Sequence, residues 1–170
     1  MRKYVYPTKI TWEDVIDKLD KEIQMGKGAY GDIACRMRDT YYLSSRYRPK
    51  TLQQAYDEVL SDCPLIISKW NEMDVYISFT GGAESFGKHK YDCDVLIVQA
   101  IGRMKYTLYK DRIPQEYILN PGESLFIPEG VYHDPTTLEP RVTLSFSGPP
   151  PPDRDWETLS VTLGSNVVGS

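Results

Sequence analysis

Histidine and cysteine are scarce in this chain of 170 residues, which contains only two histidines and three cysteines. The cysteines, Cys35, Cys63 and Cys93, show no Cys-x-x-Cys spacing, and an odd number cannot pair completely. These absences argue against a cysteine-based zinc module and against a disulfide-stapled secreted scaffold. Reduced thiols in a cytoplasmic setting are the expectation.

The chain also lacks an excess of positive charge and any long apolar run. Lysine and arginine total 20 against 24 acidic residues, a net charge of −4, whereas nucleic-acid-binding surfaces are usually strongly basic. No apolar run approaches the roughly 20 residues of a membrane-spanning helix. Residues 1–15 lack the apolar core of a signal peptide. We therefore expect a cytoplasmic protein without a membrane or nucleic-acid partner.

What the chain does contain begins with a helical part, residues 1–63. Thr11, followed by two acidic residues, predicts the start of a helix that ends near Gly26 or Gly28. The apolar residues of this helix share one face: Trp12, Val15, Ile16, Leu19 and Ile23. A capping-box pattern at Thr51 predicts a second helix. The basic, tyrosine-rich stretch between them, residues 26–50, is either a solvated irregular arm or a partner-binding surface.

Residues 64–148 carry a different pattern, in which short β-rich segments alternate with Gly, Pro, Asn and Asp. Examples are "DVYISF", "DVLIVQ" and "RVTLSFS". Many short strands with regular turns predict a sandwich or a barrel. Residues 149–170 begin with four prolines and are expected to form a stiff linker and a C-terminal tail. We expect a single domain overall, with the N-terminal helices and the basic loop packed on the barrel.

The two histidines lie 44 residues apart, each beside one of these β-rich segments. His89 precedes an apolar run in "GKHKYDCDVLIVQ", and His133 follows the tight turn Pro128-Glu129-Gly130 in "PGESLFIPEGVYH". A lone histidine is more often structural than functional. Two histidines presented at strand ends can point both imidazoles into the mouth of a barrel, so a metal site is the candidate and structural histidines are the alternative.

Four stretches in order, "SFGKHKYDCDVLIVQ", "GRMKYTLY", "LNPGESLFIPEGVYH" and "RVTLSFS", resemble the JmjC-like cupins of the Fe(II)/2-oxoglutarate oxygenase superfamily. More narrowly, they resemble cupin-like proteins encoded by tailed phages. The resemblance covers roughly residues 70–148. It implies a mainly β protein with N-terminal helices, built on a double-stranded β-helix (a jelly roll, or cupin). Active relatives are oxygenases, often hydroxylases of protein side chains, whose iron is held by His-x-Asp and a distal histidine.

Carried onto this chain, the resemblance assigns His89 to the first metal-binding histidine and His133 to the distal one. Asp94 matches a second aspartate of the family pattern that is not a ligand. The ligand carboxylate is then expected at position 91, where this chain has Tyr91. In a strand Tyr91 points the same way as His89, and Asp92 points the opposite way unless a bulge intervenes. Asp92 is the nearest substitute ligand and Tyr91 the next.

The second departure concerns the cosubstrate. Many relatives carry a Lys or Arg that pairs with the distal carboxylate of 2-oxoglutarate, and the resemblance places Met104 at that position. A thioether cannot form the charge-assisted hydrogen bonds of a guanidinium or an ammonium. Arg141 and Thr143 loosely resemble the Arg-x-Ser element that binds 2-oxoglutarate in other branches. Arg141 is therefore the candidate cosubstrate residue, and a charge at the surface or on an edge strand is its alternative role.

Two chemically independent groups are thus missing: the metal-binding carboxylate at position 91 and the basic cosubstrate residue at position 104. The glycines and prolines that shape the fold are kept. This pattern favours a degenerate metal and cosubstrate site in a binding or structural protein. Its partner would be another protein or a second copy of the chain. If virus-encoded, it would act in the host cytoplasm or in a virion, as part of the particle. The alternative is an active Fe(II)/2-oxoglutarate oxygenase that hydroxylates a protein side chain, and a metal-binding cupin with other chemistry is third.

Overall fold

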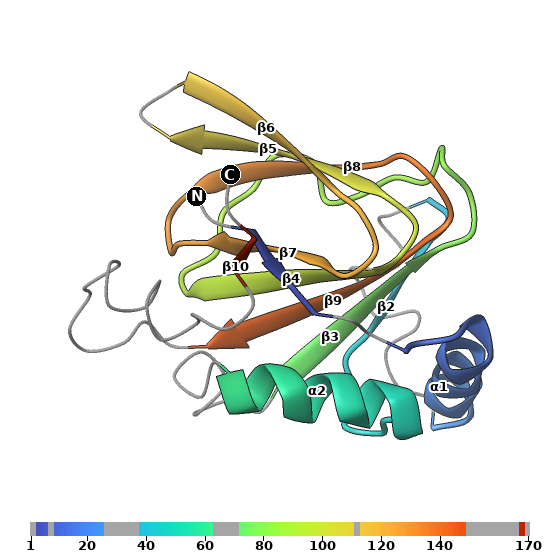
Figure 1. Ribbon diagram of the computed structural model, residues 1–170. Coiled ribbons are helices and arrows are strands. Elements are labelled where there is room, and N and C mark those ends of the chain that lie inside the picture. Colours follow the sequence, from blue (N-terminus) through green and yellow to red (C-terminus); the bar gives the residue numbers. More distant parts are fainter. Residues whose placement is uncertain are drawn as a thin grey trace.

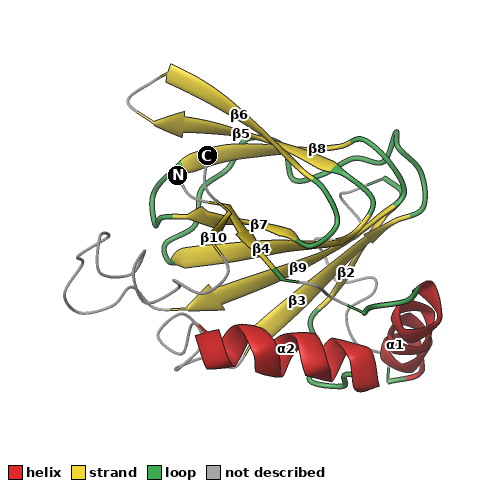
Figure 2. Ribbon diagram, viewed as in Figure 1, coloured by secondary structure: helices red, strands yellow, loops and turns green. Residues whose placement is uncertain are grey.

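The computed structural model describes residues 3–6, 9–25, 38–62, 72–110, 113–148 and 167–168. Two antiparallel sheets face each other, and two helices lie beneath the larger sheet in the view of Figures 1 and 2. The helices are α1 (Trp12–Gln24) and α2 (Lys50–Asp62). The strands are β1 (Lys3–Val5), β2 (Thr40–Leu43), β3 (Glu72–Ser78), β4 (Asp94–Ile101), β5 (Met104–Lys110), β6 (Ile113–Leu119), β7 (Glu123–Ile127), β8 (Tyr132–Thr137), β9 (Arg141–Gly148) and β10 (Val167–Val168).

The strand order places β3 and β9, the first and last strands of residues 72–148, side by side. The larger sheet runs β10-β1-β7-β4-β9-β3-β2, and the smaller runs β6-β5-β8. Strand β4 is buried along nearly its whole length because both of its faces are covered. Strand β5 alternates between buried and half-buried residues, because only one of its faces looks inward. The alternating segments predicted from the sequence are thus the strands of two facing sheets.

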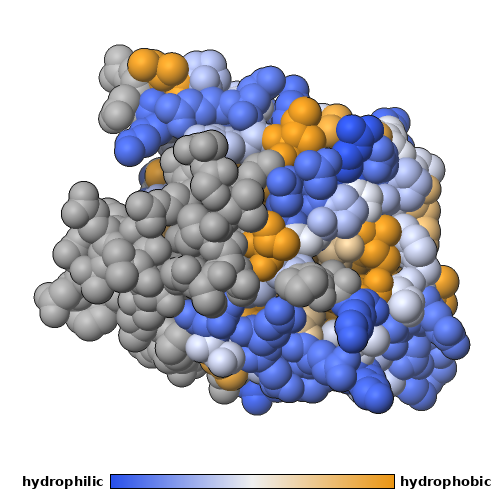
Figure 3. Space-filling model, in the orientation of Figure 1, coloured by the Kyte–Doolittle hydropathy of each residue, from blue (hydrophilic) through white to orange (hydrophobic). Residues whose placement is uncertain are grey.

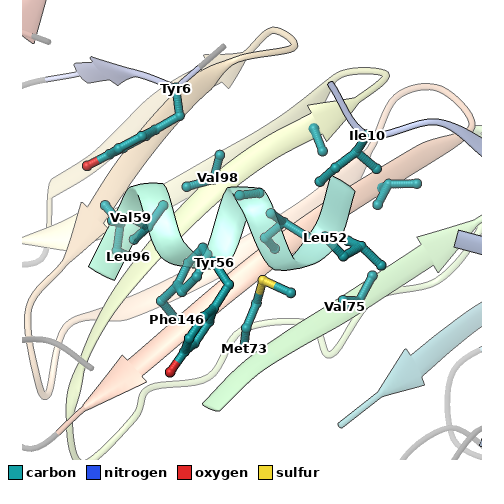
Figure 4. Packing of buried hydrophobic residues seen from close by; sticks show 14 of the residues in the cluster. Tyr6, Ile10, Leu52, Tyr56, Val59, Met73, Val75, Leu96, Val98 and Phe146 are labelled. Carbon is teal, nitrogen blue, oxygen red and sulfur yellow. The ribbon is translucent and has the colours of Figure 1, made fainter. Parts of the chain in front are cut away.

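Helix α2 covers the outer face of the larger sheet (Figure 4). Its buried side chains Leu52, Tyr56 and Val59 belong to one apolar cluster with residues of the strands beneath. The strand residues labelled there are Met73 and Val75 of β3, Leu96 and Val98 of β4, and Phe146 of β9. Each fully buried aliphatic side chain contributes about 1.5–3 kcal/mol. This packing fixes which face of β3, β4 and β9 points into the space between the sheets.

A second apolar cluster fills part of the space between the sheets. Its buried members are Val95, Ile97, Met104, Tyr106, Leu108, Leu119, Leu125 and Ile127. Met104, in the position where the resemblance leads us to expect a basic residue, is fully buried in this cluster. The remaining interior of the larger sheet is polar and includes buried Gln99, Arg141 and Thr143. The interior is therefore divided into an apolar half and a polar half.

Helix α1 begins where the sequence predicts but buries a different set of residues. The Thr11 hydroxyl caps it by accepting a hydrogen bond from the Asp14 amide, at 3.3 Å. Ile16 and Ile23, expected on the buried face, are 50% and 45% exposed. Lys18 and Glu22 are instead fully buried and form an ion pair at 2.8 Å. The expected apolar face was wrong at these isoleucines: the buried residues of α1 are Val15, Lys18 and Glu22, and Lys18 contacts the backbone carbonyls of Ser45 and Tyr47.

The turn between β4 and β5 requires glycine. Gly102 has a φ of +70°, and a Cβ built there would lie 2.0 Å from the carbonyl oxygen of Pro140. Any side chain at this position meets backbone and also adopts a conformation that L residues disfavour. The close approach holds the β4–β5 turn against the start of β9, the strand that carries Arg141.

The larger sheet contains strands from all three parts of the chain that the sequence distinguishes, residues 1–63, 64–148 and 149–170. Strands β1 and β2 come from residues 1–63, and β10 comes from the tail and pairs with β1. The expected strand at residues 64–70, the proline run 149–152 and residues 26–37 of the basic stretch lie outside the described residues. No helix in the described ranges is long and apolar enough to cross a membrane.

The surface seen in Figure 3 is largely hydrophilic, with scattered apolar groups. One such group lies at the free end of the β5–β6 hairpin, where Ile113 is 65% exposed. Strand β6 forms an edge of the smaller sheet and carries Pro114, which has no amide hydrogen for a further strand. A proline on an edge strand protects it from pairing with another chain.

Candidate functional site

The two histidines lie next to each other on adjacent segments of the interior. The amide of His89 donates to the carbonyl of His133 at 2.9 Å, and the amide of His133 donates to the carbonyl of His89 at 2.8 Å. Their ring centroids are 4.2 Å apart, with the ring planes inclined by 61°. Residues 44 positions apart in the sequence are thereby joined into one pair, as the sequence predicts.

Backbone carbonyls fix the protonation of both imidazoles. The Nδ1 of His89 lies 2.7 Å from the carbonyl oxygen of Gly87, and the Nδ1 of His133 lies 3.1 Å from that of Val131. A carbonyl oxygen can only accept, so each Nδ1 carries a proton, and Nε2 is the nitrogen whose lone pair the neutral imidazole would offer. Metal-binding histidines are commonly oriented in this way. The two imidazoles are thus oriented as metal ligands would be. Whether they can hold a metal ion depends on the third side chain beside them.

A turn anchored by Asp94 presents His133. The Oδ1 of Asp94, at the start of β4, accepts a hydrogen bond from the amide of Glu129 at 2.8 Å. The next amide, that of Gly130, donates to the carbonyl of Tyr91 at 2.9 Å. Asp94 therefore holds the turn between β7 and β8, in keeping with the expectation that it is not a metal ligand.

Tyr91 lies against both histidines. Its ring centroid is 5.0 Å from that of His89, with nearly perpendicular planes, and 5.5 Å from that of His133. Its hydroxyl is hydrogen-bonded to that of Tyr76 on β3. Burial raises the pKa of the Tyr91 phenol, and the negative charge of Asp74 adds to the rise. Tyr91 is consequently a neutral phenol at physiological pH, in the position where the resemblance leads us to expect a carboxylate.

Asp92 is not brought into this cluster. Its side chain is exposed, at a bend that precedes the start of β4 at Asp94. In the part of the chain that the structure describes, no three His, Cys, Asp or Glu side chains are grouped so that they could hold a metal ion. Fe(II) in relatives with this site requires a carboxylate beside two histidines. The residues present do not fit that ion: two imidazoles face a protonated phenol.

Arg141 is buried on the inner face of β9, not exposed at an edge. It is 2% exposed; its Nε donates to the Ser78 hydroxyl at 3.2 Å, and its Nη1 donates to the Thr143 hydroxyl at 2.8 Å. Thr143 in turn donates to the side-chain oxygen of Gln99 at 2.8 Å. Burial lowers the pKa of Arg141, opposed by the phenols of Tyr106 and Tyr76. Both candidate cosubstrate residues thus belong to one hydrogen-bonded network.

The space beside this network is too small for the cosubstrate. A cavity of about 20 Å³ is lined by both histidines, Arg141, Tyr91 and Tyr106, among others. That volume holds about one water molecule, whereas 2-oxoglutarate has five carbons and two carboxylates. Position 104 also offers no basic group to a carboxylate, since its residue is a methionine that belongs to the apolar cluster. The residues present do not fit 2-oxoglutarate in this arrangement.

A larger cavity, of about 270 Å³, adjoins the small one, and five residues line both: Tyr76, Phe86, His89, Tyr91 and Ser145. The further residues around it include Tyr42 of β2, Asp74 of β3 and Ser147 of β9. Sequence reasoning missed these three residues because they carry no motif. The only available signal was the polar residues alternating with apolar ones in "EMDVYIS" and "RVTLSFS", which indicates a polar inner face.

We predict that His133 makes the fold sensitive to acid. Burial lowers the pKa of His133 from 6.5 to about 4, and the neighbouring His89 adds to this, while the Val131 carbonyl opposes it. The unfolded chain therefore binds more protons than the folded one between pH 6.5 and 4. The free energy of unfolding should fall by about 3 kcal/mol as the pH falls through this window. Urea unfolding at several pH values measures this loss.

The matched variant is His133→Phe, which keeps a ring and removes the titrating group. As the pH falls from 7 to 4, the free energy of unfolding should fall by less in the variant than in the wild type, because the variant lacks the titrating imidazole. Charged and titratable groups around the ring, His89, Tyr91 and Arg141, remain in both proteins. If the free energy of unfolding falls equally with pH in both proteins, His133 is not the group that causes the loss of stability in acid.

Comparison with known proteins supports the fold. No protein-family model matches the chain, and no curated protein matches it. The chain is similar to YcfD, a ribosomal oxygenase from Escherichia coli, in complex with cobalt and 2-oxoglutarate, with a TM-score of 0.51 and 19% identity over 76% of this chain and 38% of YcfD. A second structure of E. coli YcfD gives a TM-score of 0.50 and 16% identity over 71% of this chain and 36% of that one.

A cupin superfamily protein from Desulfitobacterium hafniense matches with a TM-score of 0.41 and 19% identity, over 46% of this chain and 66% of that protein. The chain thus spans little more than a third of YcfD and about two thirds of the cupin protein. The predicted fold class is confirmed: the chain is a mainly β protein with a double-stranded β-helix, or jelly roll, and helices at its N-terminal side.

Proposed function

We propose that this chain is a non-catalytic protein of the oxygenase-like jelly-roll fold, in which the interior serves as a binding site instead of a reaction centre. The observation that carries the proposal is Tyr91. Its neutral phenol packs on both histidines where iron-dependent relatives need a carboxylate. Exposed Asp92 and buried apolar Met104 supply no replacement for the missing groups.

The partner of such a protein would be another protein or a second copy of the chain. The resemblance to phage-encoded proteins stays a prediction, as does a place in a virus particle. A cytoplasmic location stays a prediction, and so does the lack of a nucleic-acid partner, which the net charge of −4 supports. A binding role needs no metal, and it uses what the interior retains: rigid aromatic walls and a fixed set of hydrogen-bonding groups.

The alternative is an active oxygenase that hydroxylates a protein side chain, and one observation favours it. Arg141 is a fully buried guanidinium beside the two histidines, and its hydrogen-bond partners Ser78 and Thr143 are uncharged. Such a group attracts a carboxylate. Activity would require Tyr91 to leave the histidine pair and open the 20 Å³ cavity.

Iron uptake tests the proposal. The purified protein is equilibrated anaerobically with Fe(II), with and without 2-oxoglutarate, and its bound iron is measured after removal of free metal. We expect far less than one iron per chain under both conditions, because two imidazoles alone hold Fe(II) weakly. One iron per chain, retained more firmly when 2-oxoglutarate is present, would favour the oxygenase instead.

A further inference from the structure

The cavity of about 270 Å³ is large enough for a ligand and open enough to admit one. At about 30 Å³ per molecule of liquid water, the volume corresponds to about nine waters, enough for an alkylammonium or guanidinium side chain. Tyr42, Asp74 and Cys93, which line it, are each partly exposed. The cavity therefore connects with solvent beside the part of β3 and β9 where Asp74 pairs with Ser145.

Aromatic rings form a continuous wall around this space. Tyr42 contacts Tyr76, with ring centroids 5.2 Å apart, and Tyr76 contacts Phe86 at 5.7 Å with nearly perpendicular planes. Phe86 contacts His89 at 5.4 Å, and His89 contacts Tyr91 at 5.0 Å, again edge to face. Rings set at steep angles to one another present several faces and edges to a shared space. A cation placed over such faces is attracted by their quadrupoles.

Asp74 carries the formal charge among the described residues that line this cavity, which include no lysine or arginine. Arg141 lines the smaller adjoining cavity, and its guanidinium carbon lies 5.7 Å from the centre of the Tyr76 ring. The charge of Asp74 reaches the three phenols: it raises the pKa of Tyr42, Tyr76 and Tyr91, in each case in addition to the larger effect of burial. The phenols are therefore neutral, and Asp74 is the group that selects the sign of a ligand.

Hydrogen-bond acceptors near the carboxylate favour a cation that carries N–H groups. Tyr42 is hydrogen-bonded to Asp74, which fixes the carboxylate at the wall. The hydroxyls of Ser145 and Ser147, on the same face of β9, also line the cavity and can accept. A quaternary ammonium would leave these acceptors without donors, whereas a primary ammonium or a guanidinium can supply them.

We propose that this cavity binds a protonated alkylamine or alkylguanidinium, carried by a small molecule or by a lysine or arginine side chain of a partner protein. Aromatic faces surround the cation, and the Asp74 carboxylate pairs with its N–H groups. This proposal rests on the proposed function, because it takes the interior to be a binding site without a reacting metal.

The test is a titration of the full-length protein with n-butylammonium and n-butylguanidinium, followed by NMR chemical shifts. Neutral n-butanol and anionic butyrate are the comparison ligands. We expect saturable binding of at least one cation, with shifts at cavity residues such as Tyr76, Val95 and Ser145, and at least tenfold weaker binding of butanol and butyrate. Equal binding of butanol and the ammonium, or no saturable binding of either cation, overturns the proposal.

Asp74→Asn removes the charge and keeps the shape of the side chain. The dissociation constant of the bound cation should rise about tenfold or more, because hydrogen bonds to charged groups contribute about 1.5–3 kcal/mol. The matched control is Asp92→Asn, which removes an exposed carboxylate outside the cavity wall and should leave the dissociation constant unchanged. An unchanged constant in Asp74→Asn counts against the proposal. If that variant does not fold, the comparison of ammonium with butanol on the wild type still decides.

The source of the cation is distinguished by a further ligand, Nα-acetyl-lysine methylamide. Binding at least as tight as that of butylammonium indicates a peptide side chain, and exclusion of this ligand indicates a free amine. The iron assay on the same preparation separates this proposal from the proposed function. Absent cation binding with absent iron overturns only the cavity proposal, whereas stoichiometric iron overturns the proposed function whatever the cation titration gives.

Discussion

Replacing Tyr91 by aspartate should turn a protein that binds Co(II) weakly into one that binds it stoichiometrically, at least about 100-fold more tightly. The expected size follows from the effect of outer-shell groups, whose loss alone changes metal affinity by 10–100-fold. Position 91 lies on the same side of its segment as His89, against both histidines. Each histidine already has its Nδ1 proton held by a carbonyl. Aspartate would add the carboxylate and also remove the bulk of the phenol.

Visible absorption of Co(II) measures this gain, since the spectrum reports its ligands. Tyr91→Phe is the matched control, because it removes the hydroxyl but keeps the ring, and it should bind no more Co(II) than the wild type. Adding Met104→Lys to Tyr91→Asp should then allow 2-oxoglutarate to tighten metal binding. If the wild type binds Co(II) as tightly as Tyr91→Asp, or if Tyr91→Phe abolishes a tight wild-type site, the phenol is itself a ligand and the site is not degenerate.

The second large effect is expected far from the barrel interior, at Lys18 of α1. Its Nζ donates to the Glu22 carboxylate at 2.8 Å and to the carbonyls of Ser45 and Tyr47 at 2.9 and 2.8 Å. The Ser45 hydroxyl is a fourth neighbour, at 3.1 Å. The carboxylate and the two carbonyls can only accept, and three donated bonds require the three protons of an ammonium. Burial lowers the pKa of Lys18, and the hydrogen bond and charge of Glu22 oppose this. Lys18 and Glu22 are both fully buried. Lys18→Met should lower the free energy of unfolding by about 3–5 kcal/mol, because it leaves the Glu22 charge buried without its counter-ion.

Urea unfolding of four proteins separates lost charge pairing from lost packing. Lys21→Met, on the exposed side of the same helix, should change stability by less than about 0.5 kcal/mol. The double variant Lys18→Met/Glu22→Leu should be more stable than Lys18→Met alone, because no unpaired charge remains. Additive losses in the double variant would show that the two side chains act independently and that the ion pair does not explain their burial.

The sequence predicts those parts of the fold that depend on local pattern. The cap at Thr11 follows from residues within one turn of each other. The second helix is present, but it begins at Lys50, so Thr51 lies within its first turn and the predicted capping box at Thr51 was wrong. The meeting of His89 and His133 follows from the resemblance, which supplies the long-range pairing that the residues alone do not state. Tyr91 lies against both histidines and Asp92 is exposed, as the sequence predicts, but the strand assumed for residues 89–92 is absent, because Asp92 lies in a bend and β4 begins at Asp94.

Other features depend on partners that are distant in the sequence. No pattern in the sequence marks Lys18 and Glu22 for burial, which depends on the carbonyls of Ser45 and Tyr47 lying against Lys18. The sequence alone favours a surface or edge-strand charge for Arg141. Only the pairing of β9 with β3 places Arg141 opposite Ser78, and the pairing of β9 with β4 places its partner Thr143 opposite Gln99. Asp74 stands in a strand with no motif, so its place in the cavity wall requires the assembled sheet.

The central claim is that the interior binds without catalysing, and succinate production measures this most directly. The wild-type protein is incubated with Fe(II), oxygen, ascorbate and 2-oxoglutarate, and succinate is quantified against a protein-free control. Because Tyr91 replaces the ligand carboxylate and the space beside Arg141 admits about one water, we predict no succinate above the control. Iron-dependent release of succinate in multiple turnovers, lost in His89→Ala and His133→Ala, would contradict the account.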